Sequence, residues 1–527
     1  MRVPLVYKPG ILRDGTKFQS DFCTDGQWIR FVGGKIKKMR GQRAIALNDP
    51  NDRPLMLHFE GNKLFYATLN KIKSSTINNG LTLNNHQTLR NTVMPRGGRW
   101  QAVKFFNDNV PSIAFLLTRD AADITNVSAA QLWTKPLNDN NVLVQTNINA
   151  HANEICGGIL YSHPCLYLYG NNGILIRSRT NNPLEFTQGN NAGEDGQMYR
   201  ISTDKLLFGA NVRGGTNAPS FLFWTSNSVI YLTNVADINN VQNPVDFQVE
   251  VVTSNSSLIS TRAVVQYDSL FFWLGTDRIF VYNGIVDSVP NSINLEYFFD
   301  NVDMNRRQEI YGYKVPKYGE IRWAYPEINV QSPYCTRELV YNVRENTWYD
   351  TAIRRSCVTT RNDTGEIFSF GDSCANYPFH PDNQHHSLWK HETEHEESRN
   401  GRFLPIPSFF TTPFYGFVTF SPAKDNNAVD KYIILEEIEP DFPTTDLERL
   451  ERVEEPENEP ALLNIKVVSR LHPMSPLRTE IEIEQNINQP RKIDIRKQGR
   501  FLQITFSSDQ PYEVGNVLLK FNIGDGK

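Results

Sequence analysis

The 527-residue sequence lacks several features that would place a protein in a class at once. No run approaches the ~18 uncharged apolar residues of a membrane-spanning helix, so we expect no transmembrane span. The opening residues, MRVPLVYKPGILRDG, contain no apolar core of a secretory signal, so we expect none. Helical periodicity is scarce along the whole chain, which argues against a helical fold.

The chain also has few cysteines and a small net charge. The six cysteines never have C-x-x-C spacing, which predicts neither a disulfide framework nor a zinc ribbon, and we expect reduced structural thiols. The formal net charge is −4, so no bulk positive charge indicates affinity for nucleic acid. The cysteines are Cys23, Cys156, Cys165, Cys335, Cys357 and Cys374.

Aromatic residues, by contrast, are abundant. They make up 11% of the chain (31 Phe, 21 Tyr and 8 Trp), whereas methionine occurs only 7 times. Flat rings fill pleated surfaces well, so this composition favours a β-rich core. The hydrophobic share of 39% and the charged share of 21% are typical of a globular protein.

A short apolar strand, a turn and a second aromatic strand recur along residues 51–400. Turn dipeptides such as Asn172-Gly173 between apolar runs are strong hairpin signals. Repeated hairpins that need neighbours to bury their faces predict a β-propeller-like domain of six or seven blades. The hairpin units are GNKLFYATL, SIAFLL with QLWTKP, CLYLYGNNGILIRS, FLFWTSNSVIYL, LFFWLGTDRIFVYNG, IRWAYP with ELVYNVRENTWYD, and EIFSFGD with SLWKHE.

The sequence pattern changes after about Gly401. From there, strands with alternating apolar and polar residues, such as KYIILEEIEPDF and RFLQITFSSD, are separated by Pro, Asn and Gly. The fold class is therefore all-β, with an additional C-terminal antiparallel β-domain. We expect three parts: an N-terminal platform segment at 1–50, the propeller-like domain at 51–400, and the C-terminal domain at 401–527. The C-terminal domain is expected to pack with the N-terminal segment.

One stretch matches a zinc-protease motif, because residues 391–395 read H-E-T-E-H. On a helix, H-E-x-x-H presents two imidazoles to zinc and a glutamate as general base. Here the residues after His395 are hydrophilic, no third ligand follows, and Leu388 and Trp389 suit a strand end. We predict no catalytic zinc, although five of the ten histidines lie between His380 and His395, which leaves adventitious metal binding open.

Other catalytic templates are missing from the sequence. It contains no G-x-S-x-G elbow, no Walker loop and no sialidase S-x-D-x-G-x-x-W box. Asp268 and Asp277 flank a hairpin, where carboxylates are ordinary turn residues. We therefore predict no catalytic, cofactor-binding or metal-binding residues, and no enzyme.

Five stretches together resemble the tail nozzle (tail-tube, packaged-DNA stabilisation) proteins of short-tailed (podovirus) bacteriophages. GQWIRFVGGKIKKMRGQRAI (Gly26 to Ile45) is similar to the start of that family, and ELVYNVRENTWYD resembles its Y-N-x-R-x-N-T-W strand. SLWKHETEH resembles its L-W-x-H-E segment without the usual following Gly, and LEEIEPDF resembles an I-x-P-D-F element. The last stretch, DIRKQGRFLQITFSS with VGNVLLKFNIGDGK, is similar to its C-terminal ending.

The resemblance implies a structural component of the virion tail, assembled in the host cytoplasm. It implies a homohexameric ring that extends the portal-adaptor channel, retains packaged DNA and conducts it during genome ejection. The implied partners are portal-adaptor (head-to-tail connector) proteins, tail fibres or spikes, a tail plug or needle, and viral double-stranded DNA without sequence-specific contacts. The alternatives are a β-propeller carbohydrate-active enzyme or lectin, and a metalloprotease.

Two further expectations concern charge and tryptophan. The basic segment from Arg30 to Arg43 should face an adaptor or a neighbouring subunit, and the acidic loop from Glu436 to Pro460 suits a weakly interacting DNA conduit. Both charge runs could equally be solvated outer surface. Trp273, Trp323 and Trp348 are predicted to lie in blade cores or between blades, where aromatic side chains usually pack.

Overall fold

The computed structural model describes most of the chain, and the statements below concern that part. The described residues are 1–18, 21–47, 52–78, 82–91, 98–119, 130–138, 143–148, 152–180, 182–186, 196–212, 220–235, 246–373, 386–399, 402–416, 431–443, 461–478, 480–489 and 491–524. Strands dominate, and the described helices are α1 (Leu295–Asn301), η1 (Asn171–Gly173) and η2 (Met304–Glu309). The prediction of an all-β fold is confirmed.

Five four-stranded antiparallel sheets follow one another along the chain. They are β8 (Pro54–Glu60), β9 (Lys63–Thr68), β10 (Lys71–Asn78) and β11 (Thr82–Asn91); β12 (Gly98–Asn107), β13 (Val110–Arg119), β14 (Gln131–Pro136) and β15 (Val144–Thr146); β16 (Gly158–Ser162), β17 (Cys165–Tyr169), β18 (Ile174–Arg177) and β19 (Gln197–Arg200); β20 (Phe208–Val212), β21 (Ser220–Trp224), β22 (Val229–Val235) and β23 (Asp246–Thr253); and β24 (Val264–Tyr267), β25 (Leu270–Leu274), β26 (Ile279–Tyr282) and β27 (Val286–Ser288).

A nine-stranded sheet comes next, and one long bent strand organises it. The first half of β31 pairs with β30 and its second half pairs with β32, so the strand serves two groups of strands. The spatial order is β28 (Tyr311–Val315), β29 (Glu320–Tyr325), β30 (Cys335–Asn342), β31 (Thr347–Thr360), β32 (Ile367–Gly371), β33 (Ser387–His391), β7 (Gln42–Leu47), β34 (Glu397–Arg399) and β35 (Arg402–Leu404).

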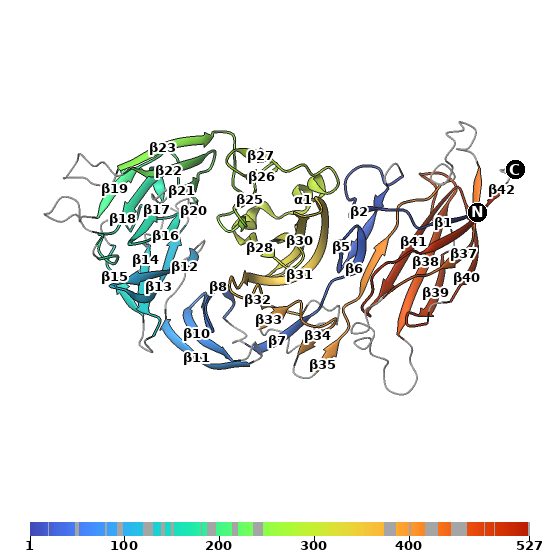
Figure 1. Ribbon diagram of the computed structural model, residues 1–527, viewed down its shortest axis with the longest axis horizontal. Coiled ribbons are helices and arrows are strands. Elements are labelled where there is room, and N and C mark those ends of the chain that lie inside the picture. Colours follow the sequence, from blue (N-terminus) through green and yellow to red (C-terminus); the bar gives the residue numbers. More distant parts are fainter. Residues whose placement is uncertain are drawn as a thin grey trace.

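Hydrophobic clusters join each of these sheets to the next. Trp100 and Trp133, for example, lie in a cluster that also contains Phe65 of the preceding sheet. The last such cluster returns to the beginning, because Leu57 and Tyr66 of the first sheet pack with Phe368 and Phe370 of β32. Figure 1 shows these sheets arranged around a common centre. We call this part, from β8 to β33 together with β7, the sheet succession.

The tryptophans named from the sequence are buried in these clusters, as predicted. Trp273 is 0% exposed and lies in the cluster between the fourth and fifth sheets. Trp323 and Trp348 lie in the next cluster, where their rings stack. Each indole N–H donates to a backbone carbonyl, those of Ser257, Ala263 and Pro290 respectively.

Two further sheets contain the first and last described strands, at the right of Figure 1. The five-stranded sheet runs β39 (Ile481–Asn486), β38 (Leu462–Arg470), β41 (Phe501–Ser508), β36 (Ser408–Thr411) and β4 (Asp25–Gln27); the four-stranded sheet runs β1 (Arg2–Pro4), β42 (Leu518–Gly524), β37 (Tyr432–Glu439) and β40 (Ile493–Gly499). Two small pairs, β2 (Lys8–Ile11) with β3 (Phe22–Cys23) and β5 (Ile29–Val32) with β6 (Lys35–Lys38), complete the N-terminal region.

The first 47 residues therefore contribute to both halves of the molecule. β1 pairs with β42 and β4 pairs with β36, whereas β7 lies between β33 and β34 in the nine-stranded sheet. The division into segments 1–50, 51–400 and 401–527 stays a prediction. Within the described ranges, no helix has the length and hydropathy that crossing a bilayer requires.

Candidate functional site

The H-E-T-E-H stretch lies at a strand end and in the bend that follows it. His391 is the last residue of β33, and Glu392 has φ of 57°. His391 Nε2 shares a 2.6 Å hydrogen bond with Ser369 Oγ, and burial, together with the nearby Arg355 and Arg322, holds the pKa of His391 well below its usual range. These residues are not on a helix, in agreement with the strand-to-loop interpretation of the sequence.

A metal site was the other possibility for this histidine-rich region. In the part of the chain that the structure describes, no group of three or more His, Cys, Asp or Glu side chains is placed to hold a metal ion. His380 and His385, which belong to the same sequence cluster, lie outside the described residues.

Glu392 instead takes part in a buried ion-pair network. Its Oε1 accepts a hydrogen bond from Arg30 of β5 and lies 3.5 Å from Arg322 Nη2. Arg30 is 1% exposed; its Nε is 3.2 Å from Glu320 Oε1, and its guanidinium lies 3.6 Å from the ring centre of Tyr318. The N-terminal hairpin β5–β6 is thus held against the nine-stranded sheet by a buried charge.

Glu338 completes this network, which we call the Arg30 network (Arg30, Glu320, Arg322, Glu338 and Glu392). Arg322 lies 2.6 Å from Glu320 and 3.3 Å from Glu338. The Tyr349 hydroxyl donates to Glu320 at 2.9 Å and the Tyr313 hydroxyl donates to Glu338 at 2.5 Å.

The two carboxyls respond to burial differently. Burial favours the neutral form of Glu320, but Arg30 and Arg322 outweigh it and lower the pKa. Burial raises the pKa of Glu338, and Arg322 offsets this only in part. The difference follows from the number of arginines at each carboxyl, because Glu338 contacts one and Glu320 contacts two.

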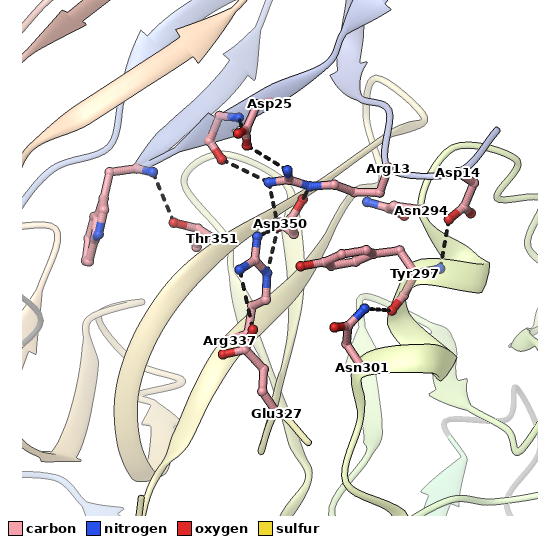
Figure 2. A network of polar contacts seen from close by, with 12 residues as sticks. Arg13, Asp14, Asp25, Asn294, Tyr297, Asn301, Glu327, Arg337, Asp350 and Thr351 are labelled. Atoms are coloured by element: carbon pink, nitrogen blue, oxygen red, sulfur yellow. Dashed lines mark hydrogen bonds and ion pairs between the residues drawn. The ribbon is translucent and has the colours of Figure 1, made fainter. Parts of the chain in front are cut away.

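A second network, drawn in Figure 2, joins the segment after β2 to β30 and β31. Asp350, whose side chain is 2% exposed, accepts from Arg13 Nε at 2.9 Å and from Arg337 Nε at 2.8 Å. Arg13 also donates to Asp25 at 2.6 Å, and both guanidiniums lie near the ring of Tyr297 at the start of α1. We call this the Asp350 network.

The start of α1 is fixed to the same N-terminal segment. The Asp14 carboxylate accepts from the backbone N–H groups of Glu296 at 2.9 Å and Tyr297 at 2.7 Å. An acid at this end of a helix satisfies N–H groups that have no partner within the helix. Since Asp14 follows Arg13, one short stretch contacts both α1 and β31.

A third set of contacts joins β6 to the C-terminal sheets. The backbone N–H of Lys38 donates to Tyr512 O at 2.9 Å, and that of Val514 donates to Ile36 O at 2.8 Å. The Lys38 side chain is buried and contacts the Asp509 carbonyl. Burial lowers the pKa of Lys38 to about 7, although Asp509 and Glu396 oppose the change.

The basic segment from Arg30 to Arg43 is thus largely engaged within the chain itself. Arg30 and Lys38 are buried, and Lys35 and Lys37 lie 3.5 and 3.6 Å from the Glu513 carboxylate. Contact with an adaptor or a neighbouring subunit stays a prediction for the exposed members of the segment. Residues 444–460 of the acidic loop lie outside the described residues.

The stretches that resemble nozzle proteins contact one another here. Arg30 of the first stretch meets Glu392 of the third, and the Asn342 side chain of the second donates to Phe31 O at 3.4 Å. The fourth and fifth also meet, because Asp441 accepts from the backbone of Gly515 at 2.9 Å and of Asn516 at 2.6 Å. Residues 525–527 of the fifth stretch are outside the described part.

Two arginines also link different sheets of the sheet succession. Arg99, at the start of β12, donates to Thr261 Oγ1 at 2.7 Å and to Cys156 O at 2.8 Å. Arg262, next to β24, donates to Leu55 O at 2.8 Å and to Glu309 O at 3.0 Å. Residues in or next to the first, second, third, fifth and last sheets are therefore linked near the starts of β8, β12 and β24.

The arrangement can hold strands in a defined register, because buried carboxylates and guanidiniums tolerate few alternative partners. The sequence interpretation missed Glu320, Glu338, Asp350 and Arg13. A signal for the first two existed: GEIRWAYP and ELVYN carry charged residues within otherwise apolar strands.

Comparison with known proteins does not establish a family. No family model and no curated protein matches the chain. Solved structures match at low similarity, among them PorZ, a surface component of the type-IX secretion system of Porphyromonas gingivalis, with 9% identity, a TM-score of 0.34, and coverage of 71% of this chain and 43% of that chain.

Two other matches are similarly distant. A puromycin-hydrolyzing peptidase of Mycobacterium tuberculosis has 9% identity and a TM-score of 0.36, and covers 71% of this chain and 61% of that chain. An exo-β-1,3-galactanase of Phanerochaete chrysosporium has 8% identity and a TM-score of 0.27, over 98% and 100% of the two chains. This chain spans less than two thirds of the length of PorZ and of the peptidase, and these similarities assign no function.

Proposed function

We propose that the chain is a structural, non-enzymatic subunit of a phage tail nozzle. In this proposal six copies form a ring below the portal-adaptor complex, retain the packaged genome and conduct it during ejection. The observation that carries the proposal is the convergence of the stretches that resemble nozzle proteins. Three of them meet through Arg30, Asn342 and Glu392, and the other two meet through Asp441. Residues that recur in a family for a structural reason are expected to contact one another in this way.

We propose further that the sheet succession is a seven-bladed β-propeller. The five four-stranded sheets would be blades one to five, and β28 to β31 blade six. The second half of β31 with β32, β33 and β7 would form blade seven. The cluster that joins Leu57 and Tyr66 to Phe368 and Phe370 supports closure of this propeller, because closure requires the last blade to pack on the first.

The DNA channel in this proposal lies between copies of the chain. The Arg99–Thr261 hydrogen bond joins the second and fifth sheets, so side chains occupy the centre of a single propeller at this end. A duplex therefore needs a lumen that several chains enclose. Portal-adaptor proteins, fibres or spikes and a plug or needle are the further proposed partners, and the virion tail is the proposed location.

Electron micrographs of the purified full-length chain, stained and classified without imposed symmetry, test the proposal. Rings of six copies with a central lumen are expected. A monomer that binds immobilised glycans, with no rings at any concentration tested, would contradict the nozzle and favour the carbohydrate-binding alternative. The variant Lys466→Met is a suitable control and should form the same assembly as the wild type. The salt bridges of Lys466 with Glu480 and Glu482 are solvent-exposed, so they contribute little to stability.

A further inference from the structure

The outer strand β23 is longer than most of its counterparts in the sheet succession. It has 8 residues, whereas the outer strands β15, β19 and β27 have 3, 4 and 3; β11, at the outer edge of the first sheet, has 10. Short outer strands are a common protection against unwanted strand pairing, and β23 lacks that protection. It contains neither proline nor lysine; of the other features that guard a free edge it has two acidic residues, Asp246 and Glu250, and one pairing irregularity next to Val252.

One edge of β23 is free in the described part of the chain. β22 pairs with it from Asp246 to Thr253, with one irregularity that leaves Val252 without an opposite residue, and no other described strand pairs with it. It forms the outer edge of its sheet at the top of Figure 1. The backbone N–H and C=O groups that point away from β22 can therefore accept an added strand.

Apolar side chains accompany this free edge. Val249 is 42% exposed and Val251 is 59% exposed, and both lie on the same face of β23 as Phe247 because side chains alternate along a strand. Phe247 packs against Tyr199, with ring centres 4.7 Å apart. Gln248 and Glu250 occupy the opposite face and are exposed. The edge thus has one apolar face and one polar face.

The sequence of β23 is complementary to itself in one antiparallel register. If Val249 lies opposite Val249 of a second copy, Val251 lies opposite Phe247 and Glu250 lies opposite Gln248. Every apolar residue of the trio then faces an apolar residue, and the carboxylate faces an amide that can donate to it. Centring the pair on Glu250 would place two carboxylates opposite each other, which is unfavourable.

We propose that β23 is a docking edge for β23 of a second copy of this chain, joined as an antiparallel pair centred on Val249. The result is one continuous eight-stranded sheet across a two-fold axis. Such an isologous contact does not close a ring of six by itself, so it is an additional contact between chains. The inference does not depend on the proposed nozzle function.

Cysteine cross-linking tests the register directly. In the Val249→Cys variant the two new thiols face each other, with Cα atoms about 4.5–5.5 Å apart, which is within the range of a disulfide. We expect a covalent dimer under mild oxidation. The Val251→Cys variant is the matched control, since its partner is Phe247 and little cross-linked dimer should form. Equal cross-linking of the two variants, or none in Val249→Cys, would overturn the proposal.

Sedimentation of the full-length chain tests the contact without cross-linking. At about 100 µM, well above the dissociation constant of a micromolar contact, the wild type should contain species that Val249→Lys removes, because two lysines would then face each other. We expect at least a tenfold weaker association for Val249→Lys. Val144→Lys, on the outer strand β15 and 68% exposed in the wild type, should leave association unchanged.

The outcomes separate this inference from the proposed function. Rings of six that Val249→Lys leaves intact, with no Val249→Cys cross-link, would overturn the β23 contact and leave the nozzle standing. Dimers with the specific cross-link and no six-fold rings would support the β23 contact and contradict the nozzle.

Discussion

The hydrophobic clusters between the small sheets and the junction formed by the Arg30 network, which joins the hairpin β5–β6 to the nine-stranded sheet, are both buried. The clusters are apolar, whereas the junction is charged. The clusters contain Trp, Phe, Leu and Ile, and Trp224 and Trp273 are both 0% exposed. The junction buries Arg30, Glu320 and Glu338, each at most 1% exposed. Apolar packing is favourable in many orientations, whereas a buried ion pair is favourable only when its partners meet. The clusters therefore supply stability, and the Arg30 network supplies a defined placement of the N-terminal strands.

The largest effect is expected where a junction arginine is removed. Arg322→Met leaves Glu338 without its arginine and Glu320 with one fewer, and breaking a buried pair costs about 3–5 kcal/mol of unfolding free energy. Denaturant unfolding of the full chain measures the loss. The double variant Arg322→Met/Glu338→Leu should recover part of it, because the orphaned carboxylate is also gone. A double variant less stable than the single one would contradict this account of the junction.

Removing a tryptophan from a cluster should cost a comparable amount of unfolding free energy. A second substitution at a neighbouring residue should not restore that loss. Trp273→Ala removes a ring that stacks on Phe280 at 5.3 Å and meets Trp224 at 5.5 Å, and such truncations cost about 3–5 kcal/mol. Adding Phe280→Leu should destabilise the variant further. Full thermal stability combined with loss of glycan binding in Trp273→Ala would instead favour the lectin alternative.

Replacement of Lys38 is expected to raise the stability of the chain rather than lower it. Its pKa is about 7 in the folded chain, against an ordinary value of 10.5 for lysine, so between these values the unfolded chain binds more protons and stability rises with pH. Lys38→Met removes the cost of burying the charge, so it should stabilise the chain by about 1–2 kcal/mol near pH 7 and flatten the dependence between pH 7 and 10. Thermal melts across that range measure both. Loss of stability in Lys38→Met would show that contacts of the ammonium outweigh its burial.

The smallest effect is expected at Glu392. Glu392→Gln keeps an oxygen that can accept from Arg30, and the side chain is 14% exposed, so a loss of about 1 kcal/mol is expected. If the proposed nozzle function holds and the residue is no catalytic base, phage carrying this change should stay close to wild-type infectivity. Stoichiometric zinc by elemental analysis, together with loss of infectivity in this variant, would restore the metalloprotease alternative.

Local signals in the sequence were sufficient to predict the hairpins and the non-helical conformation of the H-E-T-E-H stretch. Asn172 and Gly173 were predicted to form a turn, and both have positive φ (51° and 63°) between β17 and β18. The charged flank after His395 argued correctly against a helix. Such conclusions need only neighbouring residues, whose conformational preferences act locally.

The charged junction could not be derived in the same way. Arg30 and Glu320 are nearly three hundred positions apart, and no local pattern states that their strands meet. GEIRWAYP belongs to β29, which is buried on both faces, so the alternation that marks an exposed face is absent. The pairing of β7 with β33 could likewise not be predicted, because it joins strands that are far apart in the sequence.

A three-dimensional map of the assembled chain, reconstructed without imposed symmetry and with DNA present, would decide whether the chain forms the proposed nozzle. We expect six copies around a lumen that lies between chains, with Arg30 and Lys38 inside each subunit and Arg99 near the centre of each proposed propeller. A map in which the chain is not six-fold, or in which DNA passes through the centre of a single sheet succession, would contradict the proposed nozzle.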